Sequence, residues 1–178
     1  MVYLIVLVAA LARFAPHPAD FSPVYAALLF GGAFLPKRDA LWYPVAVLAV
    51  IDVMLTTLVY RMHFGWAGTL DWVGFGAVAL IGLWLRNRVS VRNVVAAALA
   101  GPTVFFIISN VAVWLSGLLY PRTAAGLGVC FLAALPFFGN TMAAGIVFSG
   151  VLFGGYEFYR RRALAGGRSL KRGAESQA

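Results

Sequence analysis

The chain has 178 residues, of which 62% are hydrophobic and only 11% are charged, and its formal net charge is +8. A soluble domain carries about 25% charged residues, so this composition excludes a water-soluble fold, and the recurring apolar runs favour a helical membrane bundle over a barrel. The basic residues lie in short gaps between these runs, which indicates membrane topology and argues against nucleic-acid binding.

Six apolar segments predict an all-α integral membrane bundle of six transmembrane helices, at residues 2–15, 22–35, 41–60, 69–85, 94–119 and 137–159. No Lys or Arg precedes the first segment, so it is expected to be a membrane helix and not a cleaved signal peptide. The first two segments are short for a bilayer about 30 Å thick. Ser22 is expected to cap the second helix, with Pro23 in its first turn.

Two later features interrupt this pattern. Pro102 lies inside the fifth segment, where it is expected to kink or break the helix. The stretch 123–135 is apolar but too short to span, so it is expected to form a loop or a helix lying in the interface. Residues 1–159 then form one membrane domain, and the basic, polar tail at 160–178 is expected to be disordered.

The basic residues predict an orientation. Eleven of the Lys and Arg residues follow the even-numbered segments, whereas only Arg13, Arg61 and Arg122 lie on the other side. The positive-inside rule then places both termini in the cytoplasm and the chain in the inner membrane.

Polar residues inside membrane segments are costly, so each is a candidate functional residue. An ionised Asp52 near the bilayer centre costs about 2.5–3.5 kcal/mol, so it must face the bundle, find a donor or be protonated. Asn110 and Trp114 share one face of the fifth segment, and Asn140 opens the sixth. In the predicted topology all four lie in the outer half, where they either line a pocket or join helices, with Trp114 as an alternative interfacial residue.

The first outer loop, residues 13–23, is rich in proline and combines Arg13, His17, Asp20 and Phe21. It is interpreted either as a lid over the pocket or as a solvated turn. His17 and His63 lack the local spacing of a metal site, so no metal or cofactor is expected. The chain lacks HExxH, GxSxG and a phosphate-binding glycine loop, so neither catalytic residues nor an enzyme are expected.

Three packing features are also predicted. The single cysteine, Cys130, is expected to be a buried small hydrophobic residue. Glu157 is expected to pair with Arg160 and Arg161 along one helix. The pairs Gly31-Gly32 and Gly154-Gly155 are expected to allow close helix packing.

A set of motifs spans nearly the whole chain: Arg13 with Pro16-His17-Pro18 and Phe21-Ser22-Pro23, Leu29-Phe30-Gly31-Gly32-Ala33, Asp52, Asn110-x-x-x-Trp114, Tyr120-Pro121 and Pro136-Phe137-Phe138-x-Asn140-Thr141. These motifs resemble an uncharacterised bacterial family of small membrane proteins with a proposed transport role. That family is similar to the S components of energy-coupling factor (ECF) transporters and, more loosely, to solitary cobalamin transporters. The resemblance implies an outward-facing vitamin pocket roofed by loops, with an energising transporter complex as partner.

Two functions are therefore weighed. The first is capture of a small, vitamin-like solute, with apolar walls from aromatic residues that include Phe21 and Tyr25 and with orienting polar groups that include Asp52, Asn110, Asn140, Arg13 and His17. The alternative is a structural or accessory membrane protein that packs against a partner and has no small-molecule substrate.

Overall fold

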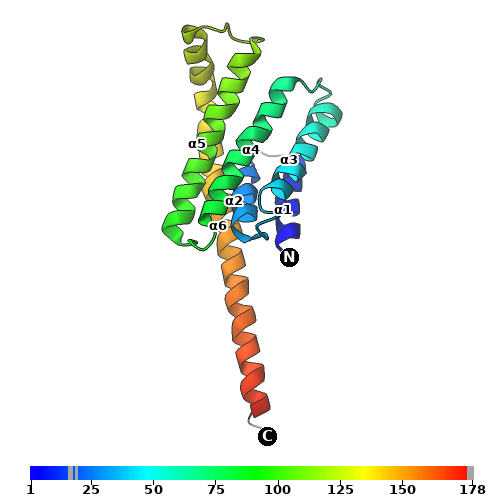
Figure 1. Cartoon of the computed structure of the whole chain (residues 1–178), viewed down its shortest axis with the longest axis vertical. Coiled ribbons are helices and arrows are strands. Elements are labelled where there is room, and N and C mark those ends of the chain that lie inside the picture. Colours follow the sequence, from blue (N-terminus) through cyan, green and yellow to red (C-terminus); the bar gives the residue numbers. More distant parts are fainter. Residues whose placement is uncertain (16–17, 19, 176–178) are drawn as a thin grey trace.

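The computed structural model describes residues 1–15, 18 and 20–175, and every regular element in this part of the chain is helical (Figure 1). The elements are α1 (Val2–Leu11), the short 3-10 turn η1 (Ala12–Phe14), α2 (Val24–Phe34), α3 (Trp42–Met54), the π-helical turn η2 (Leu55–Val59), α4 (Trp66–Leu85), α5 (Val91–Ser116) and α6 (Ala124–Glu175). The predicted all-α class is thus confirmed.

Four helical stretches among the described residues are long and apolar enough to cross a membrane: Trp42–Val59, Gly68–Leu85, Val91–Ser116 and Ala124–Ala165. They indicate an integral membrane protein. The apolar helices at Val2–Phe14 and Val24–Phe34 are shorter than a full crossing. In Figure 1 these two lie in the lower part of the bundle, and the α3–α4 and α5–α6 hairpins extend above them.

α2 is the central helix of the bundle. Every residue from Val24 to Ala33 is buried, and α2 packs mainly against α4, α6 and α1. A helix that is hydrophobic all round has no polar face to present to water, which matches this enclosed position. At its end, the rings of Phe30 and Phe34 contact those of Phe153 and Tyr156 on α6, with centroids 4.5–5.5 Å apart.

The crossing of α2 and α4 depends on two glycines. A Cβ on Gly32 would lie 2.6 Å from the carbonyl oxygen of Ala79, and one on Gly82 would lie 2.6 Å from that of Leu29. The two backbones therefore touch directly, as glycine allows in membrane bundles. The predicted packing role is confirmed for Gly32, whereas a Cβ on Gly154 or Gly155 would meet nothing within 4 Å.

Arg86, at the C-terminal end of α4, caps the C-terminal end of α2. Its Nη2 donates hydrogen bonds to the carbonyl oxygens of Gly32, at 3.1 Å, and of Leu35. A cation at this position satisfies carbonyls that the helix leaves unpaired and complements the negative end of its dipole.

The helices alternate in direction, so the connections gather at two ends of the bundle. The connections that precede α3 and α5 lie at one end together with the middle of α6 (Figure 1). Lys37, Arg86, Arg160 and Arg161 surround one cavity there, and we name this the basic end. The connections that precede α4 and α6 lie at the opposite end (Figure 1).

Several sequence expectations need correction. Residues 124–135 form neither a loop nor a separate interfacial helix, because α6 runs without interruption from Ala124 through Pro136 to Glu175. Its apolar part, Ala124–Ala165, is 42 residues long, about 63 Å. α6 also continues through 160–175, where the composition predicts disorder. Of the two effects expected of Pro102, the break does not occur, because α5 is one helix from Val91 to Ser116. The cap of α2 is Pro23, not Ser22.

Candidate functional site

The partly buried carboxylate of Asp52 pairs with a residue of η1. Arg13 Nη2 lies 3.1 Å from Asp52 Oδ1, and the two side chains are only 20% and 17% exposed. The 3-10 turn that ends α1 brings Arg13 beside α3. A charge in an apolar bundle is stable only when it is paired, so this ion pair resolves the placement that the sequence left open for Asp52.

A third charge joins this pair. Asp71, in the first part of α4, interacts electrostatically with both Asp52 and Arg13. Tyr25 at the start of α2 is 9% exposed and lies within electrostatic range of Arg13 and Asp71. We name Arg13, Asp52, Asp71 and Tyr25 the charged cluster. With one cation and two carboxylates, it carries an excess negative charge that a cationic or proton-donating group would balance.

Three buried polar atoms, one in the charged cluster and two on residues close to its members along the chain, have no hydrogen-bond partner among the residues that the structure describes: Arg13 Nη1, Ser22 Oγ and Trp72 Nε1. Ser22 stands just before α2, and Trp72 follows Asp71 on α4. An unsatisfied buried donor costs about 1–3 kcal/mol. Arg13 Nη1, which belongs to the charged cluster, is therefore a donor that a hydrogen-bond acceptor could satisfy.

Aromatic rings adjoin the charged cluster at Tyr25. The ring of Tyr25 meets that of Phe105 on α5 at 5.3 Å, and Phe105 stacks on Phe75 of α4 at 5.2 Å. Phe21 contacts Phe148 of α6 at 5.5 Å. Polar groups within apolar, aromatic walls are the usual composition of a small-molecule site.

Asn110 and Trp114 make contacts that join elements of the bundle, which is one of the two alternatives that the sequence left open for them. Asn110 is buried, and the thiol of Cys130 on α6 lies 3.5 Å from its backbone oxygen and 3.6 Å from its Oδ1. Trp114 Nε1 lies 3.1 Å from the carbonyl oxygens of both Pro121 and Thr123. Both residues thus tie α5 to α6 and to the turn between them. The predicted burial of Cys130 is confirmed.

A family model described as a family of unknown function, DUF6580, matches residues 1–169. The chain belongs to the DUF6580 family. The comparisons with curated proteins and with solved structures returned no match.

In this DUF6580 member, the structure brings together Arg13, Asp52 and Tyr25 from the predicted site. Phe21 packs nearby on α6, whereas Asn140 is exposed in the middle of α6 and does not open a helix as expected. His17 lies outside the described residues. Asp71 was missed, although a carboxylate in the fourth apolar segment breaks the same rule that singled out Asp52.

Proposed function

We propose that this protein captures a small polar solute at the charged cluster, in the half of the membrane opposite the basic end. The observation that carries the proposal is the partly buried Arg13–Asp52 ion pair with Asp71 in electrostatic range, inside an otherwise apolar bundle. Such a group is expensive to place in a membrane and, in membrane proteins, marks substrate pathways or partner contacts.

The chemistry of the charged cluster restricts the solute. Its carboxylates outnumber its cation, so a solute with a cationic or hydrogen-bond-donating group is favoured. The donors at Arg13 Nη1 and Trp72 Nε1 favour an acceptor beside that group. A vitamin-like heterocycle with both kinds of group meets these requirements. No covalent chemistry is proposed, so the role is binding and transport.

The transport setting extends the proposal. By the positive-inside rule the basic end faces the cytoplasm, both termini lie there, and the membrane is the bacterial inner membrane. α1 and α2 then complete a six-helix bundle of the S-component type, as the motif resemblance implies. Uptake would need an energising transporter complex or slow tumbling of the protein in the bilayer.

The test is native mass spectrometry of gently purified protein, followed by a thermal-shift panel of vitamins and metal ions. Asp71→Asn keeps the Arg13–Asp52 ion pair and removes one carboxylate, so a captured solute is expected to be lost. Asp39→Asn, at the basic end, is the charge-matched control and is expected to retain it. A clean apo protein that the panel does not stabilise would contradict solute capture.

The alternative is an accessory membrane protein whose polar groups join helices. The contacts of Asn110 with Cys130 and of Trp114 with the following turn favour it, because two predicted ligand residues serve packing. In that case the charged cluster is also structural. Asp71→Asn would then raise thermal stability in the apo protein, because it removes an excess buried carboxylate, and no solute would bind either form.

A further inference from the structure

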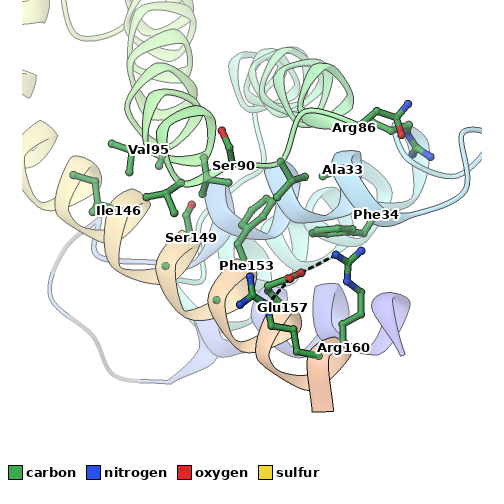
Figure 2. A pocket seen from close by; sticks show the side chains of 18 of the residues that line it. Ala33, Phe34, Arg86, Ser90, Val95, Ile146, Ser149, Phe153, Glu157 and Arg160 are labelled. Atoms are coloured by element: carbon green, nitrogen blue, oxygen red, sulfur yellow. Dashed lines mark hydrogen bonds and ion pairs between the residues drawn. The ribbon is translucent and has the colours of Figure 1, made fainter. Parts of the chain in front are cut away.

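A cavity lies at the basic end, which is opposite the charged cluster (Figure 1). It has a volume of about 950 Å³ and lies among the end of α2, the α4–α5 connection, the start of α5 and the middle of α6. Figure 2 shows Phe34 and Phe153 among the side chains that line it, together with Glu157 and Arg160. The solute-capture proposal makes no use of this cavity.

One face of α6 grades from apolar to charged along this cavity. Ile146, Gly150 and Gly154 follow one another at intervals of four and so share a face. A Cβ on Gly150 or Gly154 would meet nothing within 4 Å, so the helix surface is open there. Arg161 follows Gly154 two helical turns later and also lines the cavity, so this face of α6 changes from apolar to cationic toward its C-terminal part.

The cavity is electropositive. Lys37, Arg86, Arg160 and Arg161 line it, against the single carboxylate of Glu157 among the described lining residues. Arg160 and Arg161 pair with Glu157 at 3.1 and 2.8 Å, as predicted, but their side chains are 58% and 77% exposed. Exposed pairs contribute little, so both guanidinium groups can turn toward an anion at small cost.

Two buried hydrogen-bond donors belong to residues that line this cavity. Ser149 is 1% exposed, and its Oγ has no hydrogen-bond partner among the described residues. The same holds for Arg86 Nε. In Figure 2 the Ser149 side chain points from α6 toward α5, within the cavity wall.

We propose that this cavity binds an anionic phospholipid of the leaflet at the basic end, with the phosphodiester at Lys37, Arg160 and Arg161 and an acyl chain along Gly154, Gly150 and Ile146. The occupant follows from the change in character along the cavity. A small anion would contact only its cationic residues. A neutral lipid would contact only the apolar surface at Ile146, Gly150 and Gly154, which we name the trench. Basic pockets between membrane helices are known sites for anionic headgroups.

The experiment uses the full chain in mixed micelles, with retained lipid counted by native mass spectrometry. Phosphatidylglycerol is expected to be retained over phosphatidylcholine. Arg160→Gln and Arg161→Gln are each expected to weaken phosphatidylglycerol binding about fivefold. Gly154→Leu fills the trench without removing a charge and is expected to abolish retention, whereas Gly139→Leu, at an equally open glycine outside the cavity, is the matched control.

Three outcomes would overturn the proposal. Equal retention of both lipids would show that the basic residues do not recognise the headgroup. Unchanged retention in Gly154→Leu would show that the acyl chain does not lie along the trench. Glycerol phosphate that competes as well as the whole lipid would show a site for small anions only. Failure to retain any lipid, with cross-linking to a partner subunit through the trench, would assign the cavity to a protein helix.

Discussion

The close crossing of α2 and α4 makes Gly82→Ala a severe perturbation. The new Cβ would lie 2.6 Å from Leu29 O, 2.8 Å from Leu29 Cα and 2.9 Å from Leu28 O, all backbone atoms, where ordinary contact begins at 3.4 Å. No side chain can turn away, so α2 itself must move by several tenths of an ångström. Because α2 is buried along Val24–Ala33, that shift disturbs its packing on every side.

Overpacking of a core costs about 1–3 kcal/mol, and this site belongs at the upper end because the clash is with backbone. Alanine regains up to about 1 kcal/mol of helix propensity. The expected net loss is therefore about 2 kcal/mol, or roughly a 30-fold change in the unfolding equilibrium. The assay is unfolding by sodium dodecyl sulfate in mixed micelles, followed by circular dichroism.

Gly76→Ala is the matched control, since Gly76 lies on the same helix and a Cβ there meets nothing within 4 Å. It is expected to be neutral or slightly stabilising. If Gly82→Ala unfolds at the same detergent fraction as Gly76→Ala, the two backbones do not touch in the way described.

Three further changes test other contacts. Arg86→Gln should lower the free energy of unfolding by about 1–3 kcal/mol in the same titration, because the carbonyl oxygens of Gly32 and Leu35 lose their donor. An equal effect of Arg88→Gln, at an exposed neighbouring residue, would contradict this. Trp114→Phe should speed proteolysis in the turn between α5 and α6, because its indole donates to two carbonyls there, and an unchanged cleavage rate would refute that role. The hydrogen bond from Tyr3 lowers the pKa of Asp39, so its stabilisation is present above the ordinary carboxyl pKa and is lost as pH falls through the lowered one. Tyr3→Phe should flatten the acid side of the stability curve measured by thermal unfolding, and a curve as steep as that of the wild type would count against it.

Much of the fold was predictable because hydrophobicity alone sets it. The expected bounds of the third, fourth and fifth segments differ from the helices by a few residues, since each begins or ends where charged or turn residues interrupt an apolar run. The start of α6 was not predictable in the same way. Pro136 and the length limit of a single crossing argued for an interruption, whereas the helix continues through proline because its other backbone bonds remain intact.

The charged cluster was half predictable. Asp52 stands out in the sequence because a carboxylate in an apolar segment needs a partner, but periodicity does not say which residue supplies it. Arg13 reaches Asp52 only because α1 is short and ends in a 3-10 turn, which depends on tertiary packing. The sequence left two roles open for Asn110 for the same reason, because an amide in a membrane helix suits a ligand and a neighbouring helix equally well.

The enclosed position of α2 also dictates the order in which the protein can be completed during synthesis. α2 leaves the ribosome early, yet two of the rings that pack against its end, Phe153 and Tyr156, are among the last parts of the core to be made. Until α6 enters the bilayer, α2, which is too short to cross the bilayer, leaves one side without packing partners. Chains interrupted before Phe153 would thus present unfinished apolar surface to the proteases that clear incomplete membrane proteins.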